Sequence, residues 1–178
     1  MVATRLEPAS DSSLEDLLTR SWLRAGLGVR QAWPAPTRLS AEEVLLCALG
    51  ERCCVLATVT KRGHPRSLPV SFALDPAGRF WLPTVAGAAR LADVEANPHA
   101  AITVGQGVSG IRASLIASGS AEILAPDAIP APLLSIAIEK LGDLSWMGHW
   151  ILVRPQRLLG YGFRPADHPD GSSSRSPG

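Results

Sequence analysis

The chain has 178 residues, a formal net charge of +1 and a hydrophobic content of 46%. This length favours a single domain, and a charge so close to zero provides no long-range field for nucleic acid or an anionic membrane surface. The odd cysteine count of three argues against a secreted disulfide framework, and no apolar run approaches the roughly 18 residues of a membrane-spanning helix, so we expect a cytoplasmic protein with no nucleic-acid or membrane partner.

The first forty residues predict a helix followed by an irregular connector. Ser12 and Glu15 have the spacing of a capping box, and apolar residues recur at helical spacing as far as Trp22. Pro34 and Pro36 make regular structure unfavourable in the connector.

Composition divides the chain into three segments. The C-terminal segment, residues 165–178, is rich in Ser, Pro and Gly and has few apolar residues to bury, so we expect it to be disordered. The segments are an N-terminal helix with its Pro/Gly connector, a β-rich domain and a disordered tail, at residues 1–39, 40–164 and 165–178.

Residues 53–74 predict a β-hairpin that organises the rest of the fold. A capping box of Ser40 and Glu43 predicts the helix that precedes it. Apolar and polar residues alternate along both arms of the hairpin, which places successive side chains on opposite faces. Pro65 and Pro69 have no N–H group, so we expect the second arm to be an edge strand whose backbone a ligand can approach.

Further strands are predicted after the hairpin, the first of which would complete a three-stranded meander. A helix is also expected at residues 133–141. The later strands are expected at residues 79–84, 99–104, 111–124, 150–153 and 157–162. Short strands at close spacing with few helices predict a mainly β protein with flanking helices, in the form of a small antiparallel barrel.

Two segments have the composition of ligand-binding loops. Residues 105–110 match the pattern GxGxxG, but the segment that follows is strand-like, which favours a flexible loop over a dinucleotide site. Thr84 and Arg90 flank a turn that opens a short helix, where a hydroxyl, a guanidinium and backbone N–H groups form a candidate phosphate cradle. The alternative is an arginine that merely faces solvent. The histidines have no metal-binding spacing, so no metal site is predicted.

The order of several short motifs resembles the flavin-binding split-barrel family, which includes pyridoxamine 5′-phosphate oxidase-like proteins and deazaflavin-using relatives. The motifs are a Gly-x-Pro turn, a Pro-Val strand, a strand ending in Thr, a phosphate segment, an Asn-Pro pair and a late Gly-x-Ala-Glu. They fall at residues 63–65, 69–70, 84, 87–90, 97–98 and 119–122.

The resemblance implies a six-stranded antiparallel split β-barrel that forms a homodimer and holds FMN in a groove between the protomers. It implies that the backbone of the second hairpin arm borders the flavin ring, at Leu68, Pro69, Val70 and Ser71. It assigns the phosphate end of FMN to Thr84 and Arg90, with Arg66 and Ser114 as further candidates.

Two features depart from the family pattern. Ala88 and Ala89 stand where the family has a serine and a basic residue, a loss of about 2–4 kcal/mol of phosphate binding unless other groups replace them. Leu68 and Ala73 replace cationic residues that pyridoxamine phosphate oxidases use, so that specific activity is not expected.

We therefore expect an FMN-dependent oxidoreductase that acts on a small organic molecule. One alternative is a reductase that uses an 8-hydroxy-5-deazaflavin coenzyme in the same groove. Another is a non-catalytic protein that binds flavin or heme. No catalytic residue is assigned, because the cofactor itself carries out the hydride transfer. Trp146 and Trp150 are interpreted as pocket wall, dimer seam or core.

Overall fold

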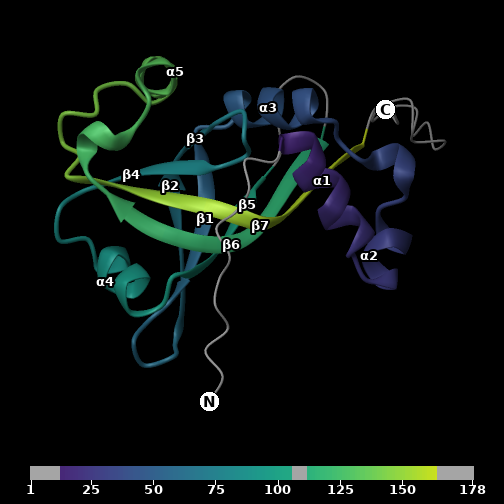
Figure 1. Ribbon diagram of the computed structural model, residues 1–178, viewed down its shortest axis with the longest axis horizontal. Coiled ribbons are helices and arrows are strands. Elements are labelled where there is room, and N and C mark those ends of the chain that lie inside the picture. The colour runs from purple at the N-terminus through teal and green to yellow at the C-terminus, as the bar shows by residue number, and fades with distance from the viewer. Residues whose placement is uncertain (1–12, 106–111, 164–178) are drawn as a thin grey trace, which may run out of the picture.

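The computed structural model describes residues 13–105 and 112–163, and in this part of the chain seven strands form one antiparallel sheet (Figure 1). The strand order is β2-β1-β5-β6-β7-β4-β3. The strands are β1 Cys53–Val59, β2 Pro65–Ser71, β3 Ala73–Leu74, β4 Phe80–Thr84, β5 His99–Val104, β6 Arg112–Leu124 and β7 His149–Phe163.

Helices flank the sheet, as the sequence predicted. They are α1 Leu14–Leu23, α2 Leu27–Ala32, α3 Ala41–Gly50, α4 Ala89–Ala96 and α5 Ala131–Leu141, with short 3-10 turns η1 Ala35–Thr37 and η2 Pro126–Ala128. The capping box of Ser40 and Glu43 is confirmed at α3. Ser13 caps α1, with its side chain accepting the N–H of Asp16, so the predicted capping pair was placed one residue too early. The predicted irregular connector contains α2, because its two prolines lie beyond that helix.

Phe72 divides the second arm of the predicted hairpin, and this division closes the sheet. β2 pairs with β1 at one edge of the sheet, whereas β3 pairs with β4 at the other edge. Because only Phe72 separates β2 from β3, the two edges meet there and the sheet curls into a half-barrel (Figure 1). The predicted continuous meander of three strands is therefore wrong, and the six-stranded prediction becomes seven strands.

A β-bulge joins the two longest strands. β6 and β7 pair along their length, and their register shifts between Ser118, which pairs with Arg157, and Gly119, which pairs with Pro155. A β carbon added at Gly119 would lie 2.0 Å from the backbone oxygen of Arg154, so only glycine fits. The bulge accommodates Pro155 within one strand, whereas the sequence predicted two strands separated at this proline.

The sheet separates two hydrophobic clusters. The larger one fills the half-barrel, where α4 and α1 contribute buried residues such as Leu91 and Leu17. The smaller one lies between β4, β7 and α5. In this smaller cluster the rings of Trp81 and Trp150 pack edge to face at 6.1 Å, and Trp150 is fully buried. Trp150 is therefore a core residue.

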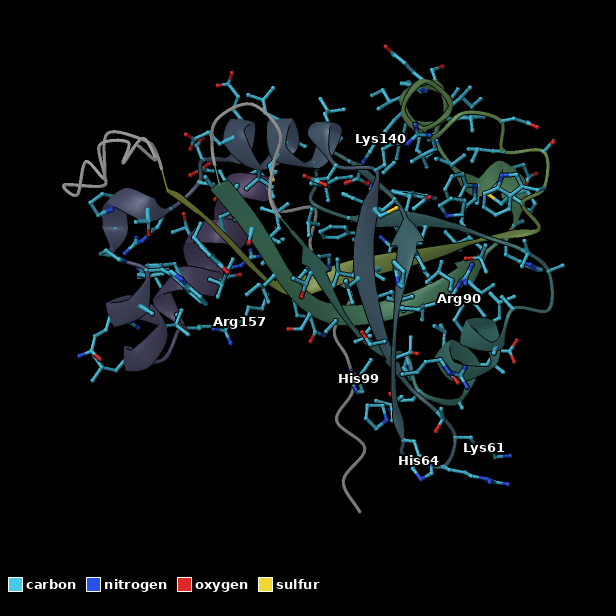
Figure 2. The ribbon with its side chains drawn as sticks, turned by 180° about the vertical axis from the view of Figure 1, so that it is seen from behind. Lys61, His64, Arg90, His99, Lys140 and Arg157 are labelled. Atoms are coloured by element: carbon cyan, nitrogen blue, oxygen red, sulfur yellow. The ribbon has the colours of Figure 1, made fainter. Side chains whose placement is uncertain are left out.

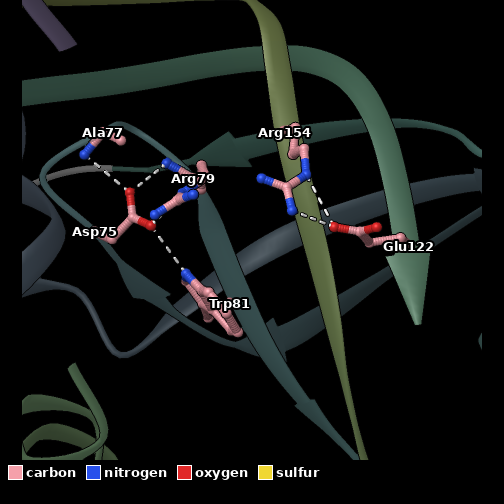
Figure 3. A network of polar contacts seen from close by, with 6 residues as sticks. All are labelled: Asp75, Ala77, Arg79, Trp81, Glu122 and Arg154. Atoms are coloured by element: carbon pink, nitrogen blue, oxygen red, sulfur yellow. Dashed lines mark hydrogen bonds and ion pairs between the residues drawn. The ribbon is translucent and has the colours of Figure 1, made fainter. Parts of the chain in front are cut away.

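The turn between β3 and β4 is stabilised by a buried carboxylate (Figure 3). Asp75 accepts hydrogen bonds from the backbone N–H groups of Ala77 and Arg79, and it pairs with the Arg79 guanidinium at 2.6 Å. The indole N–H of Trp81 donates to the same carboxylate. The Gly78 N–H donates to the carbonyl oxygen of Asp75 and closes the Asp-Pro-Ala-Gly turn.

Lys140 of α5 is half-buried where the sheet closes (Figure 2). Its Nζ donates a hydrogen bond of 2.6 Å to the carbonyl oxygen of Ala48 and lies 3.7 Å from the centre of the Phe72 ring. Burial lowers the pKa of Lys140 from 10.5 to about 8, while the neighbouring Cys54 thiol acts in the opposite direction. Lys140 therefore joins α5 to α3 at the closing point of the barrel.

Lys140 predicts a pH-dependent term in stability. The folded chain holds this proton less tightly than the unfolded chain, so the cost of burying the charge is complete below pH 8 and disappears between pH about 8 and 10.5. The free energy of unfolding of the wild type should therefore rise relative to that of Lys140→Met across this window. Urea unfolding of both proteins, below and above the window, measures the difference. Burial raises the pKa of Cys54 to about 12, and the Lys140 charge acts against this shift, so both proteins are compared in a background in which the three cysteines are replaced by alanine. Parallel pH profiles would contradict the assignment.

Gly119 predicts a large effect of a single methyl group. Gly119→Ala places its β carbon against backbone, so we expect a loss of more than about 3 kcal/mol or failure to fold. Gly28→Ala in α2 is the matched control, because nothing lies within 4 Å of the added carbon and alanine favours helix. Thermal unfolding compares the two variants. A melting temperature of Gly119→Ala close to that of the wild type would overturn the bulge register.

Candidate functional site

The inner faces of β4 and β7 end together at one opening of the half-barrel. Along β4, Leu82 faces the barrel core, and along β7, Ile151 does the same. Thr84 and His149 are the next residues on these inner faces, and they pair directly across the two strands. We call Thr84, His149, Arg90 and the loop of residues 85–88 the barrel mouth.

Arg90 is positioned by the hydroxyl of Thr84. The Arg90 Nε donates a 3.2 Å hydrogen bond to Thr84 Oγ1, and the same hydroxyl donates to the carbonyl oxygen of Leu82. Thr84 is fully buried, and burial lowers the pKa of the half-buried Arg90. Both predicted phosphate residues therefore lie together, but Thr84 orients the guanidinium rather than presenting a free hydroxyl.

The loop of the barrel mouth is held closely against the segment before β7. Gly87 has a φ of 75°, which favours glycine, and the Gly148 N–H donates to the carbonyl oxygen of Thr84. A β carbon at Gly148 would lie 2.8 Å from the backbone nitrogen of Ala86. At the start of α4, no side chain of the described residues forms a capping hydrogen bond, so the positive end of this helix faces the loop.

Arg66 lies beside the same helix but is already paired. Its Nη1 is 2.7 Å from the Asp93 carboxylate, and the Thr58 hydroxyl donates to the same oxygen at 2.9 Å. Asp93 is buried, whereas the Arg66 side chain is 39% exposed. Arg66 thus ties β2 to α4, and its contact with a cofactor stays a prediction.

The predicted flavin-bordering residues lie on β2, an edge strand as expected. Leu68 and Val70 point toward the barrel core, whereas Pro69 is exposed. Ser71 is half-buried beside the crossing at Phe72. The structure therefore provides a one-sided edge whose outer backbone groups are not paired within the sheet.

Ser114 is not brought to the barrel mouth of its own chain. It pairs with Tyr161 near the start of β6, whereas the other end of β6, at Leu124, lies beside the His149 end of β7. Ten residues of strand separate the two positions, which corresponds to about 33 Å along the strand. Ser114 can serve only a different ligand site from Arg90, or the site of a second copy.

No local pattern in the sequence assigns His149 to this site. Its position follows from the pairing of β4 with β7, which lie far apart in the chain. Of the two tryptophans interpreted as pocket wall, dimer seam or core, Trp146 is 48% exposed, whereas Trp150 belongs to the core. Residues 106–111, which contain most of the GxGxxG match, lie outside the described residues, but the strand β6 that follows is inconsistent with a dinucleotide-binding helix.

The fold and the site together define a small antiparallel half-barrel of split-barrel type with a cationic mouth between β4, α4 and β7. Residues 41–157 match the model of the pyridoxamine 5′-phosphate oxidase family, and the chain therefore belongs to this family. The predicted resemblance is confirmed. No curated protein sequence matches this chain.

Solved structures show the same fold at low sequence identity. A conserved hypothetical protein from Mycobacterium tuberculosis is 17% identical with a TM-score of 0.59, and the similarity covers 81% of this chain and 98% of that chain. An FAD binding protein from Mycobacterium smegmatis is 20% identical with a TM-score of 0.54, covering 72% and 98%. The heme storage protein HutZ from Vibrio cholerae is 19% identical with a TM-score of 0.56, covering 71% and 97%. The structural relatives thus include flavin-binding and heme-binding proteins.

The residues that the structure describes contain neither a membrane-spanning helix nor a metal-binding cluster. None of the helices in this part of the chain is both long enough and apolar enough to cross a membrane. Among the same residues, no group of three or more His, Cys, Asp and Glu side chains is arranged to hold a metal ion.

Proposed function

We propose that this protein binds FMN and uses it to oxidise or reduce a small organic molecule. The observation that carries the proposal is the Arg90 guanidinium, held by Thr84 at the start of α4. The Nε is engaged by Thr84, so the Nη groups remain as the donors directed away from that bond. Together with the positive end of α4 they suit the phosphate of FMN.

The remaining residues of the site fit the other end of the cofactor. The outer edge of β2, at Leu68, Pro69, Val70 and Ser71, offers backbone groups to the flavin ring. Ala88 and Ala89 contribute no side-chain donor, which makes phosphate binding more dependent on Arg90. When bound, FMN supplies the hydride transfer, and the chain positions it and excludes water.

Two competing functions predict different ligands in the purified protein. A deazaflavin coenzyme in the same groove would make the protein a reductase that depends on deazaflavin instead of FMN. A heme would fit a storage or carrier role, and the structural relative HutZ is a heme storage protein. Absorption spectra and mass spectra of the released ligand distinguish flavin, deazaflavin and heme.

The three free cysteines, one exposed and two buried, suit a reducing cytoplasm.

Arg90→Ala should weaken FMN binding at least tenfold, or by about 1.4 kcal/mol, because the main cation for the phosphate is removed. Binding of riboflavin, which has no phosphate, should not change. Titrations followed by flavin fluorescence measure both affinities. Arg62→Ala in the exposed hairpin turn is the matched control. An unchanged FMN affinity in Arg90→Ala would contradict the phosphate assignment.

The proposal includes a homodimer that completes the cofactor groove. On the outer face of β2, β1, β5 and β6, two rows of paired residues contain no charged side chain, and the second row meets Arg157 where it continues onto β7. The rows are Pro69, Val55, Thr103, Ile116 and Ser67, Ala57, Ala101, Ser118. Val55 is 42% exposed there, although it is a large apolar residue. A second copy would cover this face and bring the partner's Ser114 region toward the groove.

Ala101→Arg should convert the dimer into a monomer, because it places a charge in the centre of the uncharged face. The same variant should bind FMN more weakly, since half of the groove is lost. Sedimentation velocity at micromolar concentration, with and without FMN, measures both effects, and FMN should tighten the wild-type dimer. Gln31→Arg on exposed α2 is the control. A monomeric wild type that binds FMN with full affinity would rule out the shared groove.

A further inference from the structure

His149 has a buried ring nitrogen without a hydrogen-bond partner. Among the described residues, two buried side-chain atoms share this property, His149 Nδ1 and Arg157 Nε. Buried polar atoms in native proteins are nearly always paired, with the chain, with water or with a ligand. Such a nitrogen is a position where a water, an ion or a ligand atom would complete the hydrogen bonding.

The surroundings of the two atoms differ. Arg157 lies on the middle of β7, paired with Ser118, and Figure 2 shows it beside α1, away from Arg90. His149 instead lies at the end of the strand, directly opposite Thr84. Of the two orphaned atoms, only the one in His149 belongs to the barrel mouth.

The pairing brings three polar side chains to one place. Residues directly opposite each other on antiparallel strands have β carbons about 4.5–5.5 Å apart on the same face. The β carbon of His149 therefore lies beside that of Thr84, whose hydroxyl already accepts from the Arg90 guanidinium. The opposite face of β7 is occupied by Trp150 and the second hydrophobic cluster, so the ring cannot turn toward solvent on that side.

The backbone holds this arrangement in place. Gly148 is bonded to the carbonyl oxygen of Thr84 and contacts Ala86 too closely to admit any side chain. The loop itself has no side-chain donor, since its residues are Val85, Ala86, Gly87 and Ala88. Side-chain donors for an anion at this loop must come from its neighbours, and His149 of β7 is one candidate.

We propose that His149 is a second anion-binding residue of the barrel mouth, which donates a hydrogen bond from its ring nitrogen to the phosphate monoester that Arg90 contacts. This inference rests on the proposed function for the identity of the ester as FMN, but the site itself requires only a phosphate. A monoester has three terminal oxygens, so it accepts from a guanidinium and an imidazole at once. His149 thereby makes the site specific for the phosphorylated form of a ligand.

The first experiment compares FMN with riboflavin. His149→Ala should weaken FMN binding at least tenfold and leave riboflavin binding unchanged, whereas a packing role would affect both ligands equally. His149→Asn, which retains a side-chain donor, should restore part of the FMN affinity. His64→Ala in the exposed hairpin turn is the control. Circular dichroism establishes that each variant is folded. Equal FMN affinity in wild type and folded His149→Ala would overturn the proposal.

The second experiment does not depend on flavin. Nitrogen NMR of the imidazoles in the full chain is recorded during titration with inorganic phosphate. The His149 signals should shift and those of His64 should not. If the wild type binds no FMN but phosphate shifts the His149 signals, the proposed function fails and the His149 site stands for another phosphate ester. If phosphate leaves the His149 signals unchanged, or shifts those of His64 equally as an adventitious ion would, the His149 proposal is overturned even where FMN binds.

Discussion

Everything in this fold depends on the crossing at Phe72. One residue of chain spans only about 3.3 Å, so the two outermost strands of the sheet must lie next to each other where it connects them. Its buried ring packs against Phe80 at 5.8 Å and receives the Lys140 ammonium on its face. The crossing therefore closes the half-barrel, and it also fixes where α3 and α5 dock. The inner surface that ends at Thr84 and His149 exists only because the sheet is closed in this way.

The parts of the fold that sequence predicted well depend on neighbours in the chain. The capping box at Ser40 and the alternation along the hairpin are local patterns, and both are present. The sequence predictions were wrong where pairing between strands far apart in the chain determines the structure. Alternation continues unbroken through Phe72, so nothing in the pattern marks the change of sheet edge. Pro155 is unfavourable in a strand, yet the bulge opposite Gly119 accommodates it.

In the candidate site, too, local relations were predictable from the sequence and long-range pairings were not. Thr84 and Arg90 lie six residues apart, and their proximity was predictable from a strand followed by a helix. The pattern did not indicate that the Thr84 hydroxyl already forms two hydrogen bonds, one to the Leu82 carbonyl oxygen and one from the Arg90 guanidinium, which it orients. His149 joins them through a pairing that no local signal predicts. Ser114 was assigned by resemblance to proteins in which two protomers share the groove. Within one chain it lies far along β6 from the barrel mouth.

Membership of the family fixes the barrel but not its ligand. The half-barrel is defined by backbone pairing and apolar packing, both of which tolerate identities of only 20% and 19% to proteins named for FAD binding and for heme storage. Ligand choice depends instead on a few donors at the mouth and along the β2 edge. In this chain the loop has lost its side-chain donors at Ala88 and Ala89, while the two flanking elements provide Arg90 and His149. A site built from flanking elements keeps its geometry through the closed sheet, so the loop can vary without loss of the fold.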